Sequence, residues 1–220
     1  MPDWRELAER EKSRYLDGEA RLPDTSDPDA RQRQLTRMGN AAGGAGLALL
    51  MSGDRAGAVE WFVRADERYR ESFADAPPGS WGRPIGAIKA CLLADDWIRA
   101  EEAARWALDQ HADDSDSPIG RYAACLACLV LGQWEEARLL ADDLRTHEGF
   151  PRDVGDALAF VAADDPVGYW QAVDSVLDSF EERDEYLEDV PVADTVLVLQ
   201  ALALRRGIEV ELESALLPSR

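Results

Sequence analysis

The chain has 220 residues, a formal net charge of −20 and a sequence pI of about 4.4. No apolar run reaches the roughly 20 residues of a membrane helix, and the charged N-terminus lacks the apolar core of a signal peptide. Acidic residues are spread from Asp3 to Glu213, whereas nucleic-acid binding needs a clustered basic face. We therefore expect a cytoplasmic protein that binds neither membrane nor nucleic acid.

Lysine is scarce in this sequence. Lys12 and Lys89 are its only lysines, and the rest of its 24 basic residues are arginines. A dispersed acidic surface with few lysines resembles the composition of proteins from salt-in halophiles. A high-GC genome alone would also explain the arginine bias, so both origins stay open.

Glycine, proline and short polar runs divide the chain into helical segments. Residues 1–24 are predicted to form an N-terminal helix and linker, with Gly18 ending the helix, and residues 25–220 to form one helical array. Ser26 is expected to cap the next helix, with Pro28 in the first turn, where its missing N–H costs nothing. The expected helices cover residues 3–17, 28–51, 56–72, 84–94, 97–110, 119–131, 134–145, 154–163, 167–180 and 193–206. The tail that follows is expected to be extended or a short helix.

An internal repeat organises the middle of the chain. Aligning it on the turns places Gly53, Asp95 and Gly132 together, at spacings of 42 and 37 residues. Three further sets of positions then coincide at offsets of 5, 9 and 12 residues, on one face of the second helix of each pair. These sets are Ala58, Ala100 and Ala137; Phe62, Ala104 and Ala141; and Ala65, Ala107 and Leu144. Small residues at such positions let paired helices approach closely.

The clearest copy of this repeat is LGQWEEARLLADDL, residues 131–144. It resembles the tetratricopeptide repeat from its central glycine to the end of its second helix, although the spacing exceeds the usual period of about 34 residues. The resemblance implies an all-α fold, with antiparallel helical hairpins stacked as an α-solenoid. Trp97 and Trp134 occupy the same position after the turn, where we expect each to pack against the neighbouring hairpin. Trp170 is likewise expected in the core.

The same resemblance suggests a binding surface, because in that family set positions of each first helix line the concave face. The corresponding positions here are Leu47, Met51, Ile85, Lys89, Leu93, Tyr122, Leu126 and Val130. Most are apolar, and an open apolar groove of this size is unusual on a soluble monomer. We therefore expect another element to cover it, either an end of this chain or a helix of a partner.

The C-terminal stretch VPVADTVLVLQALALRRGIEVELESALLP, residues 190–218, is similar to the ending of all-helical immunity proteins of bacterial polymorphic toxin systems. Together the two resemblances imply a non-enzymatic protein-binding repeat protein or scaffold, with a toxin domain as one type of partner. The alternative is an enzyme or small-ligand-binding protein on a helical array. A deep pocket with converging titratable groups would favour that alternative.

Residue types that carry catalysis or bind metals are few. Cys125 and Cys128 form a CxxC pair, but no second pair completes the four ligands of a structural zinc site, so we expect these thiols and Cys91 to be buried and free. His111 and His147 lie in polar linkers and are expected at the surface. We predict no catalytic residue, metal or cofactor. The glycines of residues 43–46 fall within an expected helix and are interpreted as sites of close helix packing.

The charge excess leads to a prediction about salt. Like charges repel across about 30 Å at 0.01 M ionic strength but only about 3 Å at 1 M, and this repulsion destabilises the compact state. We expect the melting temperature to rise substantially between about 0.05 M and 2 M KCl, a salt that stabilises proteins less generally than sulfate does. A flat melting temperature would contradict the halophile interpretation.

Overall fold

The computed structural model describes residues 2–219 and is all-helical, with 72% of residues in helices and no strand among the residues it describes. No helix in this part of the chain is long and apolar enough to cross a membrane. The α-helices are α1 (Trp4–Arg21), α2 (Pro28–Met51), α3 (Arg55–Phe73), α4 (Gly82–Leu93), α5 (Trp97–Asp109), α6 (Pro118–Leu131), α7 (Trp134–Leu144), α8 (Arg152–Ala163), α9 (Pro166–Glu181) and α10 (Asp194–Arg205). Two short 3₁₀ helices, η1 (Leu22–Asp24) and η2 (Leu187–Asp189), lie between them.

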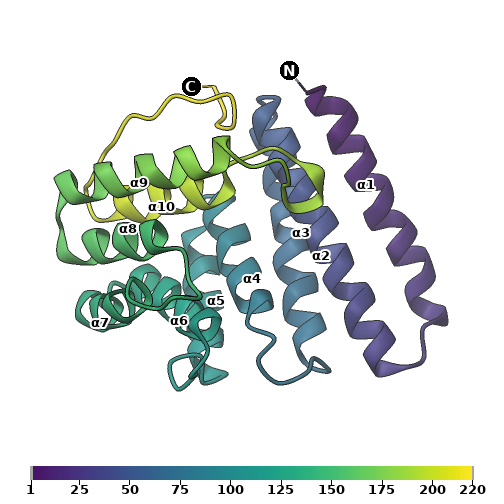
Figure 1. Cartoon of the computed structure of the whole chain (residues 1–220). Helices are drawn as coiled ribbons and strands as arrows, with labels where there is room; N and C mark the ends of the chain where they lie inside the picture. The colour runs from purple at the N-terminus through teal and green to yellow at the C-terminus, as the bar shows by residue number, and fades with distance from the viewer. Residues whose placement is uncertain (1, 220) are drawn as a thin grey trace.

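From α1 to α9 each helix packs against the next one along the chain (Figure 1). The long helices α1, α2 and α3 lie side by side at one end of the molecule, and α8 and α9 lie at the other. Helix α10 departs from this order, because it folds back and contacts α4, α8 and α9. Helix α10 therefore links the middle of the array to its α8–α9 end.

The N-terminal region differs from the sequence-based expectation in two details. Gly18 lies inside α1 rather than at its end, and it is buried because α2 passes close by, with Met38 within contact distance. The cap of α2 is Asp27 rather than Ser26, since the Asp27 carboxylate accepts a hydrogen bond from the Ala30 N–H at 2.7 Å. Both corrections are local and leave the start of α2 at Pro28, as expected.

The turns confirm the alignment of the repeats. Gly53, Asp95 and Gly132 all have positive φ angles, of 86°, 55° and 72°. After each of them the next N–H bonds back to a carbonyl five residues earlier, in the Schellman pattern that ends helices. The three bonds run from Asp54 to Leu49, from Asp96 to Cys91 and from Gln133 to Cys128, at 2.9–3.0 Å. The α8–α9 turn repeats this geometry at Asp164 and Asp165, so four helical pairs share one turn.

The second helices use their aligned positions as predicted. All nine are at most 1% exposed: Ala58, Phe62, Ala65, Ala100, Ala104, Ala107, Ala137, Ala141 and Leu144. Alanine dominates the set, so neighbouring helices come close enough to exclude water along their whole contact. The packing therefore depends on side-chain size at a few fixed positions.

Besides its buried apolar face, α10 makes two arginine–tryptophan contacts at its C-terminal end. The guanidinium of Arg205 stacks 4.6 Å from the Trp97 ring centre, and that of Arg206 stacks 4.3 Å from Trp134. The two tryptophans thus share one role, as their alignment suggests, but they face arginines of α10. Trp170 is 49% exposed, so its expected place in the core is wrong. Residues 208–219, the described part of the tail, form no regular helix or strand.

Two glycines of α2, Gly43 and Gly46, differ in the space available beside them. A Cβ atom at Gly46 would lie 2.6 Å from the Phe62 ring, which confirms close packing there. A Cβ atom at Gly43 would meet only the Tyr69 hydroxyl, at an ordinary contact distance of 3.9 Å. The two positions are three residues apart on one helix and provide a matched pair for mutagenesis.

We predict that Gly43→Ala stabilises the fold and that Gly46→Ala destabilises it. Alanine is favoured over glycine in a helix interior by about 1 kcal/mol, which corresponds to a rise of roughly 2–4 °C in the melting temperature of a domain this size. Overpacking at Gly46 should cost about 1–3 kcal/mol. Thermal unfolding followed by circular dichroism measures both, and equal shifts for the two variants would contradict the packing described.

Candidate functional site

A cavity of about 270 Å³ opens between α2, α3, α4 and the first residue of α10. Its apolar wall comes from all three array helices, and the glycines of α2 and α4 leave room for it. The polar residues among those that line it are Thr36, Asn40, Tyr69, Arg83, Lys89 and Asp194. A mostly apolar pocket with a few placed polar groups is the usual form of a ligand site.

The predicted groove positions divide into two groups in the structure. Leu47, Ile85, Lys89 and Leu93 line the cavity. In the third unit Tyr122, Leu126 and Val130 are at most 9% exposed and do not line it. Met51 is half-buried beside the core and also lies outside the cavity lining. The open part of the predicted groove is therefore confined to the first two helical pairs.

Lys89 is tied to the C-terminal segment. Its ammonium group forms an ion pair with the Asp194 carboxylate and donates to the Thr195 hydroxyl at 3.2 Å. Both side chains of the ion pair are less than one-fifth exposed. The pair joins α4 to the start of α10.

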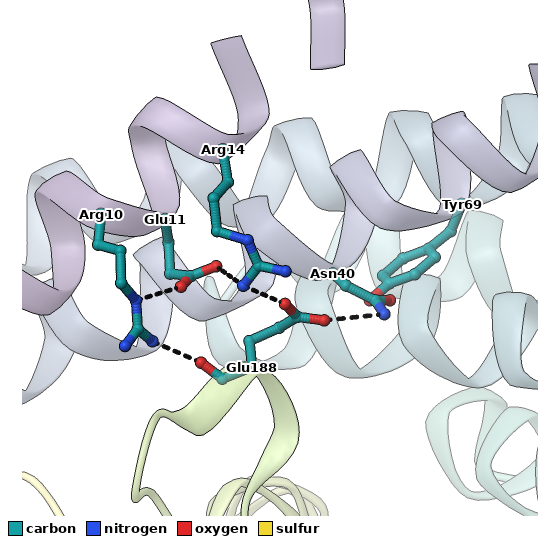
Figure 2. A network of polar contacts seen from close by, with 6 residues as sticks. All are labelled: Arg10, Glu11, Arg14, Asn40, Tyr69 and Glu188. Atoms are coloured by element: carbon teal, nitrogen blue, oxygen red, sulfur yellow. Dashed lines mark hydrogen bonds and ion pairs between the residues drawn. The ribbon is translucent and has the colours of Figure 1, made fainter. Parts of the chain in front are cut away.

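Behind the cavity a polar network joins α1, α2, α3 and η2 (Figure 2). The Tyr69 hydroxyl donates to Asn40 Oδ1 at 3.0 Å, and Asn40 Nδ2 donates to Glu188 Oε1 at 3.2 Å. The other Glu188 oxygen pairs with Arg14. Desolvation, together with the negative charges of Glu188 and Asp194, raises the pKa of Tyr69, so this hydroxyl is a hydrogen-bond donor and not a base.

The same network contains a fully buried acid, Glu11. Its carboxylate pairs with Arg10 and Arg14, both at 2.8 Å. Arg10 also donates to the backbone carbonyl of Glu188 at 2.6 Å. Glu188 has a left-handed backbone, with φ at 55°. Two arginines of α1 therefore hold the η2 segment against α2 through both its side chain and its backbone.

Arg83 completes the polar lining at the first turn of α4. Its Nε donates to Ser72 Oγ at 3.1 Å, and its NH2 group donates to Gln32 Oε1. Burial lowers the pKa of the Arg83 guanidinium, because the neutral partners stabilise its charge less than a carboxylate would.

Sequence reasoning located part of this site and missed the rest. The repeat register points to Lys89 and to the aliphatic residues Leu47, Ile85 and Leu93, because these occupy set positions of first helices. Tyr69 belongs to a second helix, and Asp194 and Glu188 belong to the segment that follows the repeats. Pairing over 105 residues, as between Lys89 and Asp194, leaves no local pattern in a sequence with 44 acidic residues.

The residues considered for metal or redox chemistry lie elsewhere. Cys91, Cys125 and Cys128 are buried, as predicted, and free. His111 and His147 are exposed. Within residues 2–219 no three side chains of histidine, cysteine, aspartate or glutamate gather in a metal-binding arrangement. Titratable groups near the cavity are thus the lysine, arginine, tyrosine and carboxylate groups described above.

Comparison with known proteins adds no relative. A scan against protein-family models gave no match, and searches of curated proteins and of solved structures gave none.

Burial of the thiols leads to a prediction about their reactivity. Desolvation raises the pKa of Cys128 to about 11, and it raises the pKa of Cys91 and Cys125 as well. The reactive thiolate is therefore rare at neutral pH, and its fraction grows about tenfold for each pH unit below the pKa. We expect slow native labelling with a thiol reagent, with Cys128 reacting first and its rate rising from pH 7 to 9. Protein unfolded in urea is the control, and equal rates in both states would contradict the burial.

Proposed function

We propose that this chain is a non-enzymatic binding protein, built as a tetratricopeptide-like stack of helical hairpins. Four residues taken from the predicted concave face, Leu47, Ile85, Lys89 and Leu93, line one open cavity. That observation carries the proposal. The four equivalent turns and the nine buried positions of the second helices support the repeat character.

The partner that we propose first is a protein, and a toxin domain fits the C-terminal resemblance to immunity proteins. Such a partner would insert an apolar side chain into the cavity, because buried apolar anchors dominate protein–protein affinity. The acidic surface of this chain, with 44 acidic against 24 basic residues, favours a basic partner and accelerates its association.

Small-ligand binding is the second candidate function. One observation favours it: the third-unit groove positions are buried, so the open space has the size of a small molecule rather than of an extended peptide. For small-ligand binding, the same cavity is the whole binding site.

The protein-partner proposal predicts the effect of filling the cavity. Gly43→Leu places an aliphatic side chain in the open space without displacing backbone, and it should keep the helical spectrum and a melting temperature at least equal to that of the wild type. We expect it to abolish binding of the partner. Binding is measured by co-purification with the proposed toxin domain and by protection of a bacterial host from that toxin. Ala56→Leu, which adds a leucine at an exposed position of α3, is the control and should behave as wild type. Full protection by Gly43→Leu would remove the cavity from the partner interface.

A further inference from the structure

Arg83 differs from most partly buried arginines of this protein. Arg31, Arg68, Arg70 and Arg145 all pair with carboxylates. Among the residues that the structure describes, no carboxylate lies within ion-pair distance of Arg83, although the chain has 44 acidic residues. Arg83 is partly buried, has neutral hydrogen-bond partners and lines the cavity, so an anion bound in the cavity would supply the opposite charge that its surroundings lack.

The structure holds the Arg83 guanidinium firmly in place. Ser72 Oγ, which accepts from Arg83 Nε, is fully buried and itself donates to the backbone carbonyl of Tyr69 at 2.8 Å. Gln32 is 3% exposed, and its Nε2 donates to Asp29 Oδ1 at 3.0 Å, which orients its carbonyl oxygen toward Arg83. Two helices therefore fix the guanidinium while leaving N–H groups for another acceptor.

The charges lining the cavity do not cancel. Lys89 is neutralised by Asp194, and the remaining charged group among the lining residues is Arg83. The lining thus carries a net positive charge within a chain of net charge −20. Much of the remaining wall is apolar, with Leu47, Phe62 and Leu93 among its members.

The dimensions restrict the ligand to a small molecule. Arg83 and Leu93 both line the cavity and stand ten residues apart on α4, which is about 15 Å at 1.5 Å per residue. A volume of 270 Å³ corresponds to roughly nine water molecules at about 30 Å³ each. An acid with an aliphatic chain of about six to ten carbons fits such a narrow, elongated space.

We propose that the cavity binds a small free carboxylic acid with an apolar chain, whose carboxylate meets Arg83 and whose chain lies along Leu47, Phe62 and Leu93. The inference rests on the cavity being a binding site, as in the second proposed function, and does not require a protein partner. A peptide C-terminus carries the same chemistry. The free acid is favoured because the third-unit side of the groove is buried, which leaves no continuous path for a peptide.

Calorimetric titration of the full chain with straight-chain carboxylates of about four to ten carbons tests the proposal. Affinity should rise roughly three- to fourfold with each added methylene until the cavity is full. Primary amides of the same length should bind at least about tenfold more weakly, because they lose the charge-assisted hydrogen bond. Arg83→Gln should remove this preference for the acid, whereas Arg37→Gln, at an exposed arginine of α2, should retain it.

A cavity-filling variant and a set of short peptides complete the test. Gly43→Leu leaves Arg83 in place but fills the apolar space, so it should abolish binding of every chain length while the melting temperature is retained. Short peptides that end in leucine should bind more weakly than the free acids. Equal affinity for acids and amides, undiminished binding to Gly43→Leu, or binding of peptides alone would overturn the proposal. Failure of the acids together with loss of partner binding in Gly43→Leu would leave the protein-partner function standing.

Discussion

Close approach of neighbouring helices is the constraint on which the rest of this structure depends. The repeat places alanine at seven of the nine positions where second helices meet their neighbours, and none of the nine is more than 1% exposed. A larger side chain at any of them would separate the helices and forfeit the contacts along their length. Identical Schellman turns then fix where each second helix begins, so spacing and direction are both set locally.

The same requirement for small residues produces the cavity. On α2, Gly46 lies against the Phe62 ring, with no space for a Cβ atom, whereas Gly43 one turn earlier faces open space. The small residues that let α2 pack closely against α3 therefore also leave a hollow where the facing side chains do not fill the space. The polar residues around that hollow are held by hydrogen bonds from α2, α3, α10 and η2, so the site is built before any ligand arrives.

Repetition explains how much of this architecture the sequence predicts. Turns, helix bounds and buried faces recur at each unit, so Gly53, Asp95 and Gly132 align correctly and their neighbours follow. The C-terminal segment has no second copy to align with. Its ion pair from Asp194 to Lys89 and its arginine–tryptophan stacks join residues that are far apart in sequence, and no periodic signal marks them. For the same reason Trp97 and Trp134 align correctly, while the arginines that they contact could not be predicted.

Arg83 lines the cavity and its hydrogen-bond partners, Ser72 and Gln32, carry no charge. With 24 basic and 44 acidic residues, each cation can find several carboxylates, and most partly buried arginines do. Arg83 is instead surrounded by amide and hydroxyl groups, in a pocket whose lysine is already neutralised. Electrostatics therefore favours one anion at this point, and the apolar wall favours one that carries a hydrocarbon chain. Because Asp194 opens α10 and also lines the cavity, such a ligand would contact the array and the C-terminal segment together. Its binding would then stabilise their association by mass action.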